Sequence, residues 1–185
     1  MDNTTKTRRI ALIPGDGIGV EVAAAARAVL DALDARHDLG IQIDEFDWSC
    51  QRYLDTGALM PPDGLDTLRA YDAVLLGAVG WEGVPDHVSL WGLLIPIRRA
   101  FTQYVNLRPV RSFAGVTSPL ADGENRPIDL VIVRENNEGE YSQVGGRFGQ
   151  GGPGETAIQE AVFTRQASVA SPTTPWSSRR DAAGA

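Results

Sequence analysis

The sequence is short of cysteine, histidine and lysine. Its single cysteine, Cys50, cannot form a disulfide within the chain, and a reducing, cytoplasmic setting is expected. The two histidines, His37 and His87, are too few to build a His/Cys zinc cluster with Cys50. Of the 17 basic residues only Lys6 is a lysine, so the choice of an amine as a catalytic acid or base is narrow.

Long apolar runs and an excess of positive charge are also absent. No stretch of about 18 apolar residues occurs, so no membrane-spanning helix is expected. Residues 1–9 are polar and have no apolar segment like that of a signal peptide. The net charge is −7, whereas nucleic-acid surfaces usually need a basic patch, so no nucleic-acid partner is expected. The hydrophobic content of 43% is compatible with a packed core.

Strand-like and helix-like segments alternate in the first part of the chain. Residues 10–13 form an apolar run that ends at a proline and a glycine cluster, and residues 18–33 have a helical pattern. Residues 41–48 are strand-like, and residues 61–69 predict a short helix. Residues 73–79 form an apolar run typical of a strand buried on both faces. This order predicts an α/β unit with parallel strand pairing.

Two helices can be described further from the sequence. In the first, 3.6-residue spacing predicts one buried stripe, made of Val22, Ala26, Val29, Leu30 and Leu33. Residues 80–86 predict a loop before the second. Residues 90–104 are expected to be helical in their second part, with Pro96 near that helix's first turn, where a missing N–H is tolerated.

The rest of the chain predicts strands, a glycine-rich loop and a tail. Residues 106–113 and 128–135 are strand-like, with a polar, turn-rich link between them. We expect residues 141–165 to form a β arm that contacts a second copy of the chain, because isolated hairpins are marginally stable in water. Residues 166–185 are rich in Ala, Ser, Thr and Pro without an apolar period, which predicts disorder.

Two glycine-containing motifs follow predicted strands. Residues 14–19 read P-G-D-G-I-G, but Val20 stands where a dinucleotide-binding fingerprint needs its third glycine, so we reject the ordinary Rossmann interpretation. Residues 76–80 read L-G-A-V-G, and open α/β sheets bind ligands beyond the carboxyl ends of their strands. For both motifs a tight turn without a ligand is the simpler alternative.

A third motif consists of three arginines near predicted strand and helix ends. They are Arg98, Arg108 and Arg134. Taken singly, each is more often a surface residue. Together they could converge on one dianionic acid, since a guanidinium group pairs bidentately with a carboxylate.

These segments resemble the β-decarboxylating dehydrogenases of the isocitrate/isopropylmalate dehydrogenase family. The resemblance is carried by residues 9–21, by N-L-R-P at residues 106–109 and by R-E-N-N-E-G-E-Y-S at residues 134–142. Residues 46–50 and 88–97 are most similar to the tartrate/D-malate branch. The resemblance extends over residues 9–165, which correspond to about the first half of a complete family member.

The resemblance implies an α/β fold of the isopropylmalate dehydrogenase type, incomplete here, with a β arm near its end. Residues 1–105 would be the N-terminal part of the large domain. Residues 106–165 would begin the second domain and include the arm. Residues 166–185 would be a tail foreign to the family, for which we favour a frameshift with early termination, or truncation, over a deliberately short binding protein.

The resemblance also implies a substrate site. Arg98, Arg108 and Arg134 would bind the carboxylates of a small 2-hydroxy diacid such as tartrate or D-malate. Tyr141 would act in proton transfer, for which a phenol is chemically suited. Leu94 would face the variable end of the substrate, with a place in the helix core as the alternative.

The family chemistry implies cofactors as well. NAD would accept the hydride, with Ile18, Gly77 and Ala78 lining the nicotinamide end of its cleft. Mg²⁺ or Mn²⁺ would polarise the substrate hydroxyl. A lysine from the partner subunit of a homodimer would take the hydroxyl proton. No aspartate pair follows residue 134, so no metal ligand is assigned here, and the ligands are expected in the family's C-terminal half.

Three alternatives remain open at this point. The lineage could be that of a 3-isopropylmalate or homoisocitrate dehydrogenase. The chain could be a non-catalytic fragment that binds an acid, or a remnant without a stable fold. In each of these interpretations the 185-residue chain alone is expected to lack dehydrogenase activity.

Overall fold

The computed structural model describes residues 7–120 and 127–166. They fall into two compact units that divide between residues 100 and 101, and each unit is described by itself. Three sequence-based predictions concern residues outside these ranges: the polar start of the chain, most of the link before residue 127, and the disordered tail.

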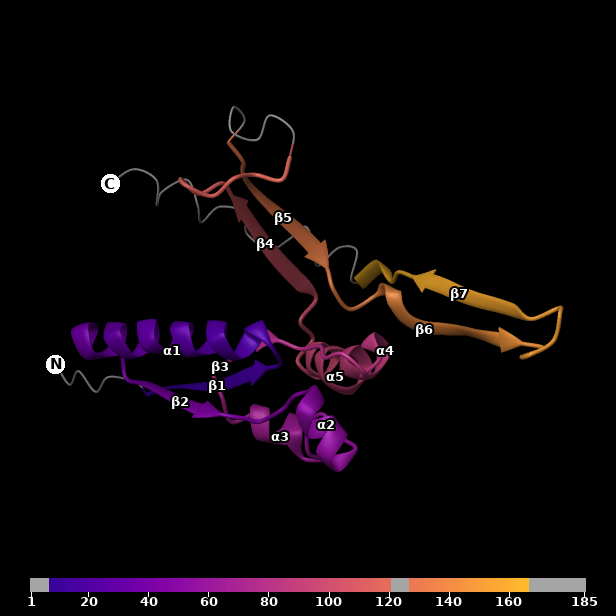
Figure 1. The fold of residues 1–185 in the computed structure, drawn as a ribbon, viewed down its shortest axis with the longest axis horizontal. Helices are drawn as coiled ribbons and strands as arrows, with labels where there is room; N and C mark the ends of the chain where they lie inside the picture. The colour runs from indigo at the N-terminus through magenta and orange to yellow at the C-terminus, as the bar shows by residue number, and fades with distance from the viewer. Residues whose placement is uncertain (1–6, 121–126, 167–185) are drawn as a thin grey trace. The chain divides into compact units, whose positions relative to one another are not determined.

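The first unit contains a three-stranded parallel sheet (Figure 1). Strand β1 (Arg8–Gly15) lies in the middle, between β2 (Ile41–Glu45) and β3 (Ala73–Ala78). Both neighbours pair with β1 in parallel, and helix α1 (Ile18–His37) packs along β1 and β3. The parallel α/β unit predicted from the sequence is therefore confirmed.

The strand at the sheet's centre supplies much of the core. Ala11, Leu12 and Ile13 are almost completely buried. Strand β3 differs from the sequence prediction of burial on both faces, because Ala73 is exposed and the rest of the strand is half-buried. The reason is position: β3 is an edge strand of the described sheet, so only one of its sides has a neighbouring strand.

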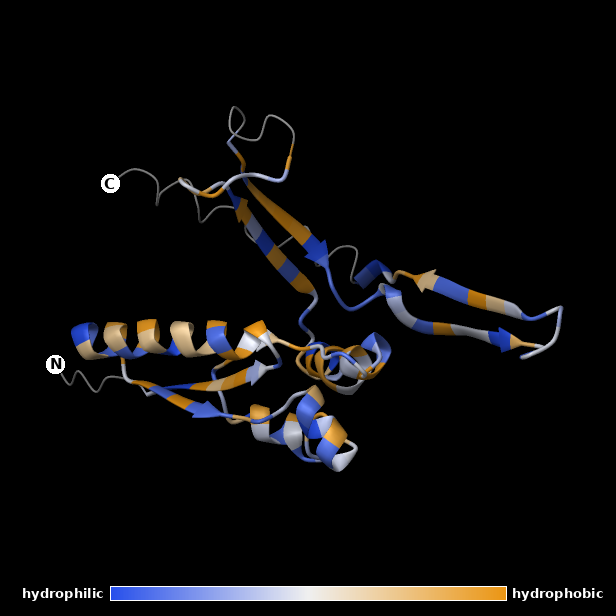
Figure 2. Cartoon of the chain, in the orientation of Figure 1, coloured by the Kyte–Doolittle hydropathy of each residue, from blue (hydrophilic) through white to orange (hydrophobic). Residues whose placement is uncertain are grey.

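The residues of helix α1 that are buried against the sheet differ from those that the 3.6-residue spacing predicted. Gly19 and Ala23 are buried, whereas three members of the predicted stripe are exposed, namely Val22, Val29 and Leu33. The backbone at Gly19 lies so close to the strand ends that a Cβ there would be 2.4 Å from the Pro14 carbonyl oxygen. This contact fixes the rotation of the helix, and apolar residues line its solvent side (Figure 2).

Short helices complete the first unit. They are α2 (Cys50–Thr56), α3 (Gly64–Leu68) and a continuous helical segment made of α4 (Asp86–Ser89), the π-helical turn η1 (Leu90–Leu94) and α5 (Ile95–Ala100). Pro96 is the second residue of α5 and so lies in its first turn, as predicted, but the sequence did not predict that α4 and η1 extend the helical segment back to Asp86. Pro96 has no N–H to donate, and the wider π turn ends two residues before it, at Leu94.

The second unit contains two antiparallel strand pairs. Strand β4 (Val105–Arg111) pairs with β5 (Asp129–Glu135), and β6 (Gly139–Phe148) pairs with β7 (Thr156–Val162). The β6–β7 hairpin is the predicted arm, and every residue of β7 is exposed. Its contact with a second copy stays a prediction. Among the described residues, no helix is both long and apolar enough to cross a membrane.

Candidate functional site

The two glycine motifs meet at the carboxyl ends of β1 and β3. The backbone N–H of Asp16 donates to the Ala78 carbonyl at 2.7 Å. A Cβ added to Gly77 would lie 2.2 Å from the Pro14 carbonyl oxygen, so backbone packs directly on backbone here. Gly77 and Ala78 therefore hold this turn together, while the neighbouring Ile18 side chain is 64% exposed and open to a ligand.

Asp16 is a residue of this region whose role sequence reasoning missed. Its side chain is buried, and its carboxylate accepts the backbone N–H groups of Cys50 at 3.0 Å, Gly80 at 3.2 Å and Gln51 at 3.3 Å. Two of these donors lie in the first turn of α2, where N–H groups lack partners within the helix. One carboxylate thus fixes the first glycine loop, the start of α2 and the loop after β3. An acid between two glycines after a buried strand was the available signal.

The Cys50 thiol lies next to this carboxylate and is fully buried. Burial, and then hydrogen bonding to Asp16, raise the pKa of the thiol to about 11. A thiol with so high a pKa is protonated at neutral pH and is a poor nucleophile. Cys50 is therefore part of the core and not a reactive group.

The second unit brings several of the predicted site residues together. Arg134 Nη2 donates to Asn136 Oδ1 and to Tyr141 Oη, both at 3.0 Å. The Arg134 guanidinium carbon also lies 5.6 Å from the centre of the Tyr141 ring. Asn106 Nδ2 donates to Asn136 Oδ1 at 3.3 Å, and Arg108 Nε donates to Asn106 Oδ1 at 3.4 Å. The two arginines and the tyrosine are thus joined through two asparagines.

Strand register explains this arrangement. Asn106 on β4 lies directly opposite Arg134 on β5. Arg108 follows Asn106 by two positions and therefore points to the same face of the strand pair. Asn106, Arg108 and Arg134 therefore lie on two paired strands, which hold side chains more rigidly than a loop does, while Asn136 follows β5 and Tyr141 lies on β6.

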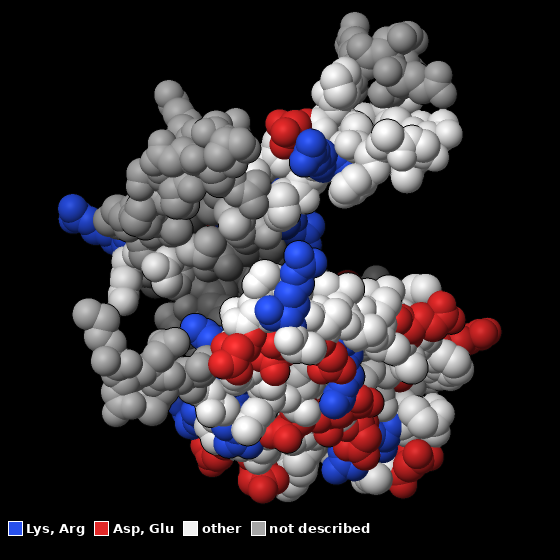
Figure 3. Space-filling model, turned by 90° about the vertical axis from the view of Figure 1, so that its left-hand side faces the viewer, with Lys and Arg blue, Asp and Glu red and all other residues white. Residues whose placement is uncertain are grey.

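The charges of the three predicted substrate arginines are not neutralised within the described chain. Ion pairs are made by four other arginines, namely Arg9, Arg27, Arg69 and Arg147. No described carboxylate lies within ion-pair distance of Arg98, Arg108 or Arg134. Arg134 Nε is buried, and no described residue accepts from it. Elsewhere acidic and basic side chains are interspersed on the surface, as on the face in Figure 3. Guanidinium groups without a protein carboxylate are suited to bind an anion.

Arg98 and Leu94 belong to the first unit. Both are half-buried, and their spacing of four residues places them on one side of the helical segment. The adjacent Leu93 is fully buried and belongs to the core, whereas Leu94 is half-buried, and its contact with substrate stays a prediction. Because each unit is described by itself, the convergence of Arg98 with Arg108 and Arg134 stays a prediction.

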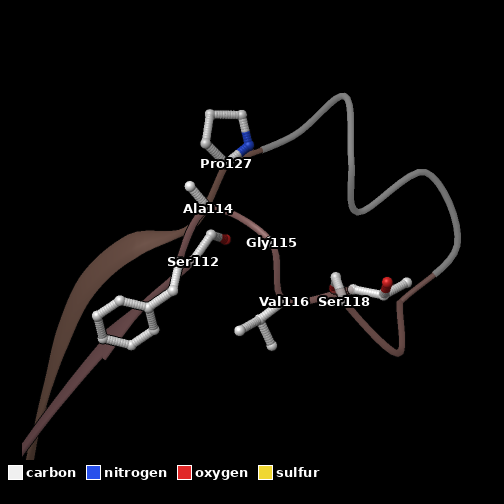
Figure 4. A pocket seen from close by; sticks show the side chains of 8 residues that line it. Ser112, Ala114, Gly115, Val116, Ser118 and Pro127 are labelled. Atoms are coloured by element: carbon white, nitrogen blue, oxygen red, sulfur yellow. The ribbon is translucent and has the colours of Figure 1, made fainter.

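A hollow of about 460 Å³ lies in the connection between β4 and β5 (Figure 4). Its lining is made of residues 112–118 and Pro127, none of which is charged. An adjoining hollow of about 380 Å³ adds Arg111 and mainly apolar side chains. Neither contains a residue predicted to bind substrate or cofactor, so the asparagine-linked arginines are the better candidate site.

Comparisons with known proteins agree on one family. The isocitrate/isopropylmalate dehydrogenase family model matches residues 9–171. The chain is 51% identical over 160 residues to a tartrate dehydrogenase/decarboxylase of Pseudomonas putida, covering 85% of the chain and 44% of that protein. It is 52% identical over 163 residues to the D-malate dehydrogenase [decarboxylating] of Escherichia coli, covering 87% and 45%. The chain thus spans a little under half the length of these curated relatives.

Solved structures show the same relationship. An isocitrate dehydrogenase from Methylococcus capsulatus superposes with a TM-score of 0.69 at 29% identity, covering 88% of the chain and 44% of that structure. A β-decarboxylating dehydrogenase from Thermococcus kodakarensis superposes with a TM-score of 0.57 at 28% identity, covering 87% and 42%.

Proposed function

The chain belongs to the isocitrate/isopropylmalate dehydrogenase family, and from this premise we propose that it forms the carboxylate-binding part of a dehydrogenase site for a small 2-hydroxy diacid such as tartrate or D-malate. One observation carries the proposal. Arg108 and Arg134 are linked through Asn106 and Asn136 beside Tyr141, and no described carboxylate neutralises either arginine.

The arginines and the tyrosine have different proposed roles. The guanidinium groups of Arg108 and Arg134 bind and orient substrate carboxylates through charge-assisted hydrogen bonds. Arg134 donates to the Tyr141 oxygen, so it occupies a lone pair of the phenol and not its proton. We propose Tyr141 as the proton donor to a substrate oxygen, a role for which a phenol is chemically suited. We propose that Arg98 completes the arginine set and that Leu94, on the same helix side, contacts the variable end of the substrate.

NAD is the proposed cofactor and would supply the hydride acceptor. One feature of the glycine loop supports a contact with the nicotinamide ring of NAD, because Ile18 presents an exposed apolar side chain beside the strand ends. Gly77 and Ala78 support this loop by contact with residues 14–19. We propose that the three residues together form one wall of the cofactor cleft.

The described residues do not fit a divalent metal. No group of three or more His, Cys, Asp or Glu side chains within residues 7–120 and 127–166 is placed to hold an ion. Hard cations such as Mg²⁺ require several oxygen ligands. The described residues alone therefore support no metal-dependent step.

A homodimer is proposed on the basis of the β6–β7 hairpin. Its exposed apolar residues include Val144, Phe148 and Ile158, and the pairing register places these three on one face. An exposed apolar face on a hairpin is suited to pack against a second copy. A cytoplasmic setting is proposed too, supported by the single cysteine.

Binding of dicarboxylates by the purified chain tests the proposal. We expect calorimetric titration to detect binding of tartrate or D-malate, and we expect the chain to bind either acid more tightly than 3-isopropylmalate. Arg134→Ala should weaken binding about tenfold or more, because a hydrogen bond to a charged group contributes about 1.5–3 kcal/mol. The matched control is Arg147→Ala, which removes an arginine that already pairs with Glu155 in the same unit.

Two results would contradict the proposal. One is equal binding by the wild type and Arg134→Ala, and the other is a preference for 3-isopropylmalate. With NAD and Mn²⁺ added, we expect no NADH formation from the 185-residue chain. Turnover of about 1 s⁻¹ or more would show that the chain is itself a complete enzyme. Binding without turnover also agrees with the alternative of a non-catalytic acid-binding protein.

A further inference from the structure

We propose that Asn106 and Asn136 are positioning residues that orient the Arg108 and Arg134 guanidinium groups while leaving their positive charges un-neutralised. The inference rests on the proposed function, because it concerns how the same site is prepared for an anion. It assigns a role to two neutral residues, which is distinct from the carboxylate-binding role of the arginines themselves.

Asn136 is held at both ends of its side chain. It is 7% exposed, and its backbone N–H donates to the Tyr104 carbonyl at 2.9 Å. Its Nδ2 group donates to the Gln103 carbonyl at 3.4 Å, while Oδ1 accepts from Arg134 and Asn106. A buried amide that is engaged on both its donor and acceptor sides has one orientation, so the acceptor that Arg134 meets is fixed in place.

Asn106 extends this arrangement to the second arginine. Its Nδ2 group donates to the Asn136 oxygen, and its Oδ1 accepts from Arg108 Nε. The two amides therefore form a chain in which each guanidinium group meets a neutral carbonyl oxygen. Two positive charges that would otherwise repel each other are kept on one strand face by acceptors that carry no net charge.

The neutrality of these acceptors is what favours an anion site. A carboxylate at position 136 would form an ion pair with Arg134, and a substrate carboxylate would then have to compete with it. Such an ion pair between an arginine and a carboxylate is present at Arg9, whose Nη2 lies 2.9 Å from the Asp44 carboxylate. Arg9 is thus a neutralised, structural arginine, whereas Arg108 and Arg134 are oriented and remain charged.

The test combines ligand binding with a direct view of the guanidinium group. Asn136→Asp is nearly isosteric and adds one negative charge beside Arg134, and Asn136→Ala removes the acceptor without adding charge. We expect tartrate or D-malate to bind about tenfold more weakly to the aspartate variant and severalfold more weakly to the alanine variant. Gln150→Glu is the control, because it makes the same charge change at an exposed turn of the β6–β7 hairpin, and its binding should stay within about twofold.

The second readout is the Nε–Hε NMR signal of Arg134, which does not depend on a ligand. Its Nε is buried, so the wild-type signal should exchange slowly with water, and Asn136→Ala should accelerate the exchange. If Asn136→Asp does not fold, half-buried Asn106→Asp carries the same binding test at Arg108. The inference is overturned if a folded aspartate variant binds as tightly as the wild type, or if the Arg134 signal is unchanged in Asn136→Ala.

The two proposals fail in different ways. If the wild type binds neither tartrate nor D-malate, yet the Arg134 signal is protected in the wild type and released in Asn136→Ala, the positioning role is supported and the proposed substrate class is wrong. If the ligands bind and folded Asn136→Asp and Asn106→Asp bind them equally well, the proposed function holds and the positioning role is wrong.

Discussion

The Asp16 carboxylate accepts the backbone N–H of Cys50 at 3.0 Å and lies beside the Cys50 thiol, although the two residues are 34 positions apart. This contact joins the first glycine loop to the start of α2. Because Gly80 donates to the same carboxylate, the loop after β3 is tied to it as well. The conformation of three segments at the strand ends therefore depends on one negative charge.

Asp16→Asn should loosen all three segments. The amide keeps one acceptor oxygen but loses the charge, and hydrogen bonds to charged groups contribute about 1.5–3 kcal/mol. We expect a loss of about 1–3 kcal/mol in unfolding free energy by urea titration. Asp55→Asn, at an exposed position in α2, is the control and should change it little. Equal stability of Asp16→Asn and the wild type would contradict the role assigned to Asp16.

The Cys50 thiol should react slowly with iodoacetamide in the folded chain. Its pKa is raised from 9.0 to about 11, mainly by burial, so little thiolate exists at pH 8. A raised thiol pKa contributes stability that is complete below pH 9.0 and is lost as the pH rises to about 11. Mass spectrometry should show alkylation only when urea unfolds the chain. Rapid alkylation of the native chain at pH 8 would show that the thiol is accessible.

Asp44 should contribute to acid sensitivity. The Arg9 guanidinium and then the Tyr71 hydroxyl hold the pKa of this carboxyl below its usual 3.8. A depressed pKa gives stability that is present above 3.8 and is lost as the pH falls through the lower, folded value. The urea midpoint of Asp44→Asn should therefore fall less steeply with acid than that of the wild type. Asp66→Asn, which removes an exposed partner of Arg69, should retain the wild-type slope.

Gly77→Ala should disrupt the carboxyl end of the sheet. The added Cβ would lie 2.2 Å from the Pro14 carbonyl oxygen and 2.8 Å from that of Gly19, and neither backbone atom can move without displacing β1 or α1. We expect a loss of about 3 kcal/mol or more, or no soluble folded chain. A Cβ at Gly154 meets nothing within 4 Å, so Gly154→Ala should keep the wild-type melting temperature. Similar melting temperatures for both variants would rule out this packing.

Ile158→Lys should weaken self-association if the hairpin is a dimer contact. The lysine would place a charge on the apolar face shared with Val144 and Phe148. Ala157→Lys is the matched control, because Ala157 is exposed and points to the opposite face. Sedimentation velocity should show a dimer for the wild type and Ala157→Lys, and a shift to monomer for Ile158→Lys. A wild-type monomer would contradict the proposed dimer.

The elements that could be predicted from the sequence are those whose ends are marked by proline or glycine. Strand β1 ends at the glycine loop as expected, and the sequence placed β3, β5 and β7 closely, because apolar runs between turn residues define short strands. The helical start at Asp86 was missed. Its N-cap is Pro85, which makes no side-chain hydrogen bond, so no capping signal marks it.

In the candidate site, the two arginines and the tyrosine were predictable from the sequence, and the two asparagines that link them were not. Arg108, Arg134 and Tyr141 stood out through the family motifs, and the structure joins them within one unit. Asn106 and Asn136 did not, because their role depends on the register that sets Asn106 opposite Arg134. That register depends on the long connection between β4 and β5, which no local pattern determines.

The π turn η1 sets the direction in which the following helix points its side chains. A π turn closes its hydrogen bond over one residue more than an α turn, so it takes up one extra residue without breaking the helix. Regular winding through the same residues would rotate everything after it by about 100°. Leu94 and Arg98 would then emerge from another side of the segment. Deleting one residue of η1 would therefore restore a regular α turn and leave Arg98 on its present side, whereas a one-residue deletion in the α-helical turn between η1 and Arg98 would rotate Arg98 to another side.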